Sequence, residues 1–349
     1  MRTETLVDTA QELLAGDRGI LAMDESIGTC DRRFAAAGIE PSVETRRAYR
    51  ELLVTTPGLS DSVHGAILFD ETIRQSGSDG VPLIDVLIDS GVMPGIKVDT
   101  GTVPLAGHPG ELITQGLDGL RDRLNTYRMM GARFAKWRAV FSICESTPSA
   151  GCIEANVSSL ASYAALCQDA GLVPIVEPEV LMEGDHTQAR CGAVTEQVLR
   201  TLFVGLHAER VVLEAVVLKP NMVLPGIGCD EQPTAEEVAE ATLTCLLRAV
   251  PAAVPGIAFL SGGQSGELAS SRLNAINRRS RGHDPWALGF SFGRAIQQPA
   301  LTIWHGEEAN VTAAQQALRH RARCNQMARR GEYTRAVEDT MDTGARVAA

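Results

Sequence analysis

Lysine is rare in this chain, and its few lysines stand at the ends of short apolar segments. The sequence has 349 residues with 32 lysines plus arginines, yet lysine occurs only at Lys97, Lys136 and Lys219. Arginine stays protonated in proteins, whereas a lysine amine can lose its proton and act as a nucleophile. The lysines are therefore the first candidates for chemistry that arginine cannot perform.

Lys219 is the candidate nucleophile, because it ends the apolar run in the segment AVVLKPNM (215–222). Burial and neighbouring cations both lower the pKa of an amine, which makes it reactive at neutral pH. The alternative interpretation is a structural ion pair between Lys219 and Glu177 or Glu179. The pattern favours catalysis over this alternative.

Two pairs of charged residues occur at a spacing of two, which places both members of a pair on one face of a strand. The cationic pair is Lys136 and Arg138, and the anionic pair is Glu177 and Glu179. Two adjacent cations require an anionic partner, either a carboxylate or a substrate phosphate. One glutamate could neutralise a lysine while the other transfers protons; a plain charge network is the alternative.

Two later segments contain the residue types of an oxyanion site. The glycine-rich turn SGGQSGE (261–267) comes first, and SFGR (291–294) follows. Gly262 and Gly263 would let backbone N–H groups approach an oxyanion, and Arg294 would add a charged donor. Many glycine-rich turns bind nothing, so this prediction depends on where the segments fall in the fold.

Metal and disulfide chemistry are not expected from the sequence. The seven histidines show neither HxH nor HExxH spacing, and the eight cysteines include no CxxC pair. Reduced cysteines in a cytoplasmic protein are the simplest interpretation. We therefore expect no metal site.

Eight short apolar runs of strand type must position these residues, and nearly every run ends in an ionisable or phosphate-binding residue. Amphipathic segments between the runs predict helices, among them 114–130, 157–170, 188–207 and 309–330, and one that begins after a cap at Thr234. The runs are GILAMDE (19–25), GAILFDE (65–71), GIKVDTG (95–101), FAKWR (134–138), VPIVEPE (173–179), AVVLKPNM (215–222), GIAFLSGG (256–263) and LGFSFGR (288–294).

Strands that alternate with helices in this way predict an α/β protein with a single (β/α)8 barrel domain. The barrel would span about residues 15–330, followed by a polar, mobile tail over 331–349. A doubly wound sheet is the alternative, but no GxGxxG follows the first run and no GxxxxGK[ST] occurs. Because a barrel carries its chemistry at the carboxyl ends of its strands, the charged residues above should meet in one mouth.

The composition of the chain argues against nucleic acid and membrane as binding partners. The formal net charge of −11 argues against nucleic-acid binding, which normally needs a basic surface. No apolar run reaches the roughly 18 residues of a membrane span. The amino-terminal segment MRTETLVDTAQELL lacks the apolar stretch of a signal peptide, so a cytoplasmic location is expected.

The ends of the runs resemble class I fructose-bisphosphate aldolase, from about residue 10 to about residue 335. The resemblance implies a metal-independent (β/α)8 barrel with no cofactor, usually a homotetramer. It would reversibly cleave fructose 1,6-bisphosphate to dihydroxyacetone phosphate and glyceraldehyde 3-phosphate. The segments that carry the resemblance, in this order, are LAMDESIGT, GIKVDTG, FAKWR, VPIVEPE, LKPNM, FLSGGQS and FSFGRA.

The resemblance implies a role for each catalytic candidate. Lys219 would form a Schiff base with the ketone carbon of the substrate. Glu177 would be the acid and base for carbinolamine formation and dehydration, with Glu179 supporting the charge network. Lys136 would help to position the imine, and Asp24 would handle the hydroxyl proton released when the carbon–carbon bond breaks.

Substrate contacts are implied in the same way. The rest of the sugar phosphate would contact Lys97, Arg138, Ser26 and Thr29. One phosphate would be held by Ser261, Gly262, Gly263 and Arg294, with Ser291 and Arg33 nearby.

The carboxyl terminus departs from the pattern of the family. Many members end in a tyrosine that assists proton transfer, whereas this chain ends GARVAA and its last tyrosine is Tyr333. The preference for the bisphosphate over fructose 1-phosphate therefore stays open at this point.

Two further functions also stay open: a metal-free isomerase of sugar phosphates that uses Glu177 as its base, and a non-catalytic scaffold.

Overall fold

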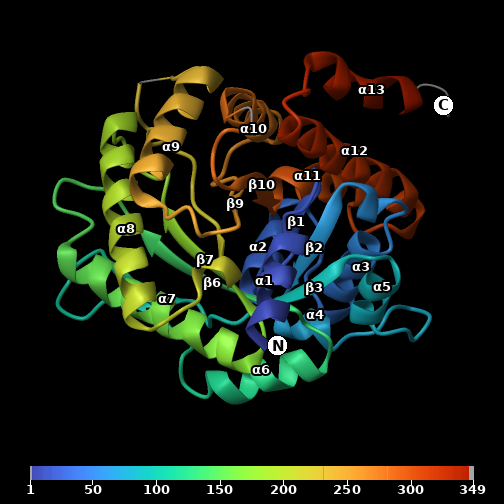
Figure 1. Ribbon diagram of the computed structural model, residues 1–349. Coiled ribbons are helices and arrows are strands. Elements are labelled where there is room, and N and C mark those ends of the chain that lie inside the picture. Colours follow the sequence, from blue (N-terminus) through green and yellow to red (C-terminus); the bar gives the residue numbers. More distant parts are fainter. Residues whose placement is uncertain (1, 231, 281, 346–349) are drawn as a thin grey trace.

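The computed structural model of the protein describes residues 2–230, 232–280 and 282–345. Eight parallel strands close into a barrel in the order β1-β10-β9-β8-β7-β6-β3-β2, with helices around it (Figure 1). Each strand falls on one of the predicted apolar runs, so the predicted (β/α)8 barrel is confirmed. The strands are β1 (Gly19–Ala22), β2 (Val63–Leu68), β3 (Met93–Lys97), β6 (Phe134–Phe141), β7 (Val173–Val180), β8 (Val217–Leu218), β9 (Gly256–Phe259) and β10 (Ala287–Phe292).

The strands are apolar along most of their length because both of their faces are covered, by helices outside and by packed side chains inside. Every residue of β2 and β7 is buried. Inside the barrel, a Cβ atom added at Gly95 would lie only 2.1 Å from the Phe134 ring, so glycine is the residue that this position accepts. The interior is thus a filled core, and the open space lies at one end.

Some outer helices begin or end where the local sequence predicts. Thr234 forms a capping box with Glu237, and Gly171 ends α7 in a left-handed conformation with φ of 81°. The helices are α1 (Arg2–Leu13), α2 (Ile27–Ala36), α3 (Val43–Val54), α4 (Asp70–Ile73), α5 (Leu83–Asp89), α6 (Leu120–Met129), α7 (Ala150–Ala170), α8 (Gln188–Ala208), α9 (Ala235–Ala249), α10 (Gly266–Ser280), α11 (Arg294–Trp304), α12 (Val311–Arg329) and α13 (Arg335–Ala345).

Helix α1 lies across the amino-terminal end of the barrel, near the centre of Figure 1. Its residue Leu13, and Leu14 just after it, pack in one buried cluster with Ile20, Phe134 and Val217, which belong to three strands. This helix precedes the barrel boundary predicted near residue 15. Because it covers one end of the barrel, only the opposite end, where the strands finish, is left for a site.

Two helices begin at residues other than those predicted from the sequence. The helix predicted over 114–130 begins only at Leu120, because residues 112–114 form β5 (Leu112–Thr114), which pairs with β4 (Thr102–Pro104) in an antiparallel hairpin. Gly116 and Gly119 adopt positive φ and exclude a helix from that stretch. Helix α7 begins at Ala150, before the predicted 157, because the Ser149 side chain caps it.

The segment after Gly331 lies outside the barrel, as predicted, and through residue 345 it contains α13, which contacts α12. Among the helices that the structure describes, none has the length and apolarity needed to span a bilayer. The mobility predicted for the tail remains a prediction, and residues 346–349 lie outside the described residues.

Candidate active site

A cavity of about 900 Å³ opens at the carboxyl ends of the barrel strands. Each strand end contributes one or two polar side chains, because the closed parallel sheet brings all these ends to one mouth. All residues that the sequence analysis assigned to the site line this cavity: Asp24, Ser26, Thr29, Arg33, Lys97, Lys136, Arg138, Glu177, Glu179, Lys219, Ser261, Gly262, Gly263, Ser291 and Arg294.

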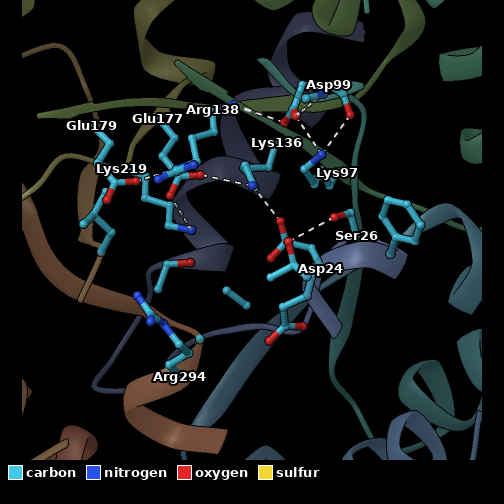
Figure 2. A pocket seen from close by; sticks show the side chains of 18 of the residues that line it. Asp24, Ser26, Lys97, Asp99, Lys136, Arg138, Glu177, Glu179, Lys219 and Arg294 are labelled. Atoms are coloured by element: carbon cyan, nitrogen blue, oxygen red, sulfur yellow. Dashed lines mark hydrogen bonds and ion pairs between the residues drawn. The ribbon is translucent and has the colours of Figure 1, made fainter. Parts of the chain in front are cut away.

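Lys136 lies between two carboxylates at the centre of the cavity (Figure 2). Its Nζ atom is 2.6 Å from Oδ2 of Asp24 and 3.2 Å from Oε2 of Glu177. Asp24 follows β1, whereas Lys136 and Glu177 belong to the paired strands β6 and β7. The ion pairs thus connect strands from opposite parts of the sequence.

Glu177 also contacts the candidate nucleophile, with 3.0 Å between its Oε1 atom and Nζ of Lys219. The backbone N–H of Lys219 donates to the Val176 carbonyl over 2.8 Å, which fixes Lys219 beside the strand that carries Glu177. Lys219 and Glu177 are only 3% and 4% exposed. A buried amine beside a carboxylate that can accept or return a proton is the arrangement that covalent catalysis by lysine requires.

The charges of this cluster set its protonation states. Burial alone would raise the pKa of Asp24, but Lys136 and Lys219 outweigh burial and lower it to about 2. Burial likewise opposes ionisation of Glu177, yet the same two lysines lower its pKa. For Lys136, burial would lower the pKa, whereas Asp24 and Glu177 raise it. At neutral pH both carboxylates are therefore ionised and Lys136 is a fixed cation.

Two further cations of the mouth, Arg138 and Lys97, are also paired with carboxylates. The Arg138 guanidinium donates to Glu179, so the charged pairs predicted on β6 and β7 do face each other. Lys97 Nζ is 2.6 Å from Oδ1 of Asp99, whose other oxygen accepts the Arg138 backbone N–H. These carboxylates keep the cations in place before an anionic substrate arrives.

The far side of the cavity contains the residue types of an oxyanion site. Gly262 and Gly263 adopt φ values of 53° and 86°, a left-handed turn that side chains disfavour. Arg294 is the first residue of α11, so its exposed guanidinium stands at the positive end of a helix. The Ser291 hydroxyl is buried with no hydrogen-bond partner in the described part of the protein. Unused donors that converge beside a helix amino terminus favour a phosphate.

Three predicted contact residues lie on α2 or at its amino-terminal cap, and neighbouring groups hold them. Ser26 donates to Thr29 over 3.1 Å, and both side chains remain at the cavity wall. Arg33 forms an ion pair with Glu25 and donates to the buried Gln297 amide over 3.3 Å. Arg33 is therefore oriented by protein groups and does not point freely into the cavity.

Sequence reasoning gave no role to several residues at this site. Asp99 holds Lys97, and Glu25 binds both Arg33 and Arg50. The spacing of two between Lys97 and Asp99 was a usable signal, because residues two apart on a strand share a face. The partners of Glu25 come from α2 and α3, and no local pattern connects them.

Tyr333, the last tyrosine of the chain, is not among the residues that line the described cavity. Its hydroxyl donates to Glu338 of α13 over 2.6 Å, and its backbone N–H donates to Asn274. In this conformation Tyr333 does not take the place of the terminal tyrosine that many aldolases carry.

Comparison with known proteins agrees with the fold and identifies the family. The family model of glycolytic class-I fructose-bisphosphate aldolase matches residues 5–348. A probable fructose-bisphosphate aldolase class 1 of Xanthomonas campestris is 55% identical, over 95% of this chain and 99% of the relative. Fructose-bisphosphate aldolase B of Gallus gallus is 50% identical, over 95% and 91%. Fructose-bisphosphate aldolase of Plasmodium falciparum, solved with TRAP and an inhibitor, superposes with a TM-score of 0.94 at 45% identity, over 95% and 96%.

A closed barrel with a lysine–carboxylate cluster at its mouth fits a carbon–carbon lyase of the aldolase class, and the family match shows that class. More particularly, the chain belongs to the class-I fructose-bisphosphate aldolase family. Its reaction is the reversible cleavage of fructose 1,6-bisphosphate through a lysine Schiff base, the general mechanism of class I, which is independent of metal. The isomerase and the scaffold are thereby set aside.

Proposed function

We propose that Lys219 forms the Schiff base with C2 of fructose 1,6-bisphosphate. The Nζ atom adds to the ketone to give a carbinolamine, which loses water to give a protonated imine. The C3–C4 bond then breaks, and its electron pair moves into the imine to form an enamine. Glyceraldehyde 3-phosphate leaves, C3 takes up a proton, and water releases dihydroxyacetone phosphate. The observation that carries this assignment is the buried contact of 3.0 Å between Lys219 and Glu177.

Glu177 is proposed to transfer the protons of carbinolamine formation and dehydration. In the free enzyme two lysines hold its pKa low, so it begins as a carboxylate. When Lys219 becomes the neutral nitrogen of the carbinolamine, one of these cations disappears and the proton affinity of Glu177 rises. Glu177 is then able to carry the proton that the departing hydroxyl needs.

Lys136 and Asp24 are proposed to act at the other end of the breaking bond. Their contact of 2.6 Å supports an ionised Asp24, and this carboxylate is proposed to accept the C4 hydroxyl proton. Lys136 remains a cation between Asp24 and Glu177, and so helps to position the imine. Glu179 supports this arrangement through its pair with Arg138.

The two phosphates of the substrate are proposed to bind at opposite sides of the cavity. The first site combines the hydroxyl of Ser291 and the guanidinium of Arg294 with the backbone of the glycine-rich turn, Ser261, Gly262 and Gly263, with Arg33 nearby. The second contact surface contains Lys97, Arg138, Ser26 and Thr29.

Borohydride trapping tests the assignment of Lys219. The protein is incubated with dihydroxyacetone phosphate, reduced with borohydride, digested and mapped by mass spectrometry. We expect a stable adduct on Lys219 and loss of activity in proportion to labelling. An adduct on Lys136 or Lys97 with Lys219 unmodified would contradict the assignment but would leave the family mechanism intact.

Arg294→Ala is expected to weaken substrate binding. A charge-assisted hydrogen bond contributes about 1.5–3 kcal/mol, so KM for fructose 1,6-bisphosphate should rise roughly 10- to 100-fold. The matched control is Arg200→Ala, which removes an exposed arginine of α8 that pairs with Glu196. Steady-state kinetics that give equal KM values for the two variants would contradict a phosphate contact at Arg294.

Chelation is expected to leave cleavage unchanged. The protonated imine serves as the electron sink, a task that a metal ion performs in metal-dependent carbon–carbon cleavage. Dialysis against EDTA should therefore leave kcat within experimental error of the untreated enzyme. A loss of activity that added zinc restores, in the wild type and in a Cys324→Ser variant alike, would refute a metal-free reaction.

A cytoplasmic homotetramer is also proposed. The resemblance to class I aldolases supports the assembly, and a relative from Arabidopsis thaliana, 51% identical, is named as cytosolic. Light scattering of the purified protein tests the assembly: a mass of four chains of 37.2 kDa is expected, and a monomer would contradict it.

A further inference from the structure

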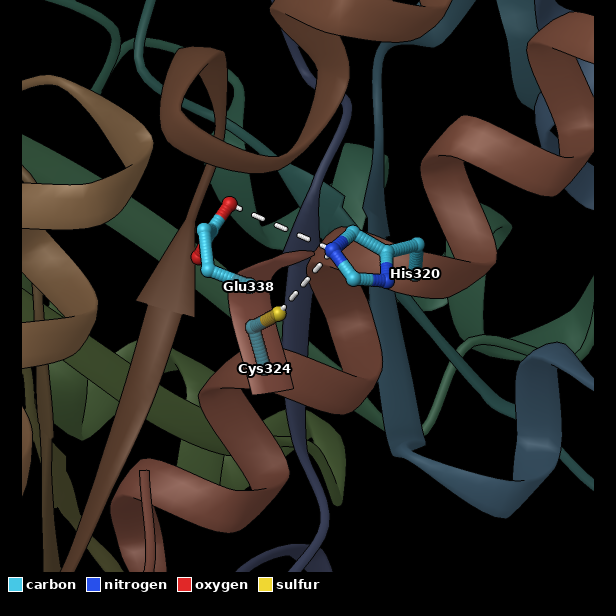
Figure 3. A group of neighbouring side chains, drawn as sticks. All are labelled: His320, Cys324 and Glu338. Atoms are coloured by element: carbon cyan, nitrogen blue, oxygen red, sulfur yellow. Dashed lines mark hydrogen bonds and ion pairs between the residues drawn. The ribbon is translucent and has the colours of Figure 1, made fainter. Parts of the chain in front are cut away.

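Three side chains with metal-binding atoms meet where α13 crosses α12, away from the active site (Figure 3). His320 and Cys324 lie one helical turn apart on α12, and Glu338 approaches them from α13. Their Nε2, Sγ and carboxylate oxygen atoms all lie within 4.8 Å of one another. None of the three lines the active-site cavity as the structure describes it.

We propose that His320, Cys324 and Glu338 bind a divalent cation of zinc type, which ties α13 to α12. The donor set of one imidazole, one thiolate and one carboxylate is a set that zinc accepts, with water in the fourth position. Binding displaces the thiol proton of Cys324 into solvent, and the cation takes its place on sulfur.

The distances between these atoms are close to those of a tetrahedral site. Zinc bonds of about 2.3 Å to sulfur and about 2.0–2.2 Å to nitrogen and oxygen place neighbouring ligand atoms roughly 3.4–3.6 Å apart. The Sγ atom of Cys324 is 3.4 Å from Nε2 of His320, and Oε1 of Glu338 is 3.9 Å from the same nitrogen. The Glu338 oxygen would have to approach this nitrogen by about half an ångström to reach that spacing, and it lies within 4.8 Å of Sγ of Cys324.

The surroundings of Glu338 suit a metal ligand. Arg321 forms an ion pair with its Oε1 atom, and the Tyr333 hydroxyl donates to Oε2 over 2.6 Å, so the carboxylate is already oriented. Such outer hydrogen bonds commonly fix the direction of ligating carboxylates. One thiolate and one carboxylate offset the charge of a dication, and Arg321, which shares the Glu338 carboxylate, leaves the cluster with one net positive charge.

Polar contacts contribute much to the position of the first part of α13. Within 335–340 only Val337 and Glu338 are partly buried, and the other residues are exposed. Side chains with so little covered surface gain little from packing, so the polar contacts of Glu338 do much to fix this part of the helix. A cation at the cluster would therefore restrain the segment that leads to the carboxyl terminus.

Cobalt titration tests the proposal, because thiolate-bound Co²⁺ absorbs in the near ultraviolet. The full-length protein is treated with EDTA, kept reduced, and titrated with Co²⁺. We expect one equivalent to bind, with a thiolate band that Cys324→Ser removes. The matched control is Cys144→Ser, which removes an exposed thiol and should keep the band. His320→Gln, at a partly exposed position, should also weaken Co²⁺ binding at least roughly tenfold, and circular dichroism checks that each variant is folded.

Hydrogen exchange tests the tether itself. Zinc is expected to slow amide exchange within α13 in the wild type, and Glu338→Gln should abolish that protection. Loss of the cobalt band in Cys144→Ser, unchanged affinity in folded His320→Gln, or binding without protection of α13 would each overturn the proposal. Absence of any binding at micromolar Co²⁺ would overturn it as well.

Discussion

Replacement of Lys219 by arginine is expected to abolish cleavage while the protein stays folded. Arginine keeps the positive charge that Glu177 pairs with over 3.0 Å, but it cannot lose its proton and add to a ketone. Removal of a covalent nucleophile leaves only binding and electrostatic stabilisation, so kcat should fall about 10⁴-fold or more. The measurement is the initial rate of fructose 1,6-bisphosphate cleavage, followed through the release of glyceraldehyde 3-phosphate.

Two comparisons make this prediction specific. Lys219→Met removes both the amine and the charge, and should be as inactive as Lys219→Arg. Both variants should also yield no borohydride adduct, and circular dichroism should show the melting transition of a folded barrel. Substantial turnover in a folded Lys219→Arg protein would refute the covalent mechanism at this residue.

Glu177→Gln is expected to lower kcat by about 10²- to 10⁴-fold, the range typical of a lost general acid or base. The glutamine keeps the shape of the side chain but cannot carry the proton between carbinolamine and imine. Because Lys219 itself is intact, the borohydride adduct should still form on it, only more slowly. This slow labelling distinguishes a lost proton carrier from a lost nucleophile.

Glu179→Gln is the matched comparison for Glu177→Gln. Glu179 lies on the same face of β7 but contacts Arg138 and not Lys219. Its replacement should therefore cost less in kcat than the replacement of Glu177. Equal losses in the two variants, or adduct formation at the wild-type rate in Glu177→Gln, would show that Glu177 does not transfer these protons.

Much of the fold could be predicted from the sequence because barrel strands are buried on both faces. Because of that burial, each strand is an apolar run in the sequence. Because the chemistry of a barrel takes place at its strand ends, a polar residue follows each run. Lys136 and Arg138 could be assigned to one face from their spacing, since a strand repeats every two residues. Helix boundaries were predicted where a cap marks them, as at Thr234.

The β4–β5 hairpin could not be predicted in the same way. Its strands have three residues each and are largely exposed or half-buried, so neither shows an apolar pattern. Pairing between two short segments is decided by the tertiary structure, and the helical periodicity of the following residues placed the start of the predicted helix at Thr114, the last residue of β5.

The sequence by itself determined which residue types stand at the strand ends, including the lysine whose amine the reaction needs. Only the tertiary structure decided which charges meet: Lys136 between Asp24 and Glu177, and Glu338 beside His320. The physical reason is that the two kinds of property depend on neighbours at different separations along the chain. Periodicity reports the burial of a residue relative to its near neighbours along the chain, whereas pKa values and ion pairs depend on groups brought together through space by closure of the barrel and packing of its helices.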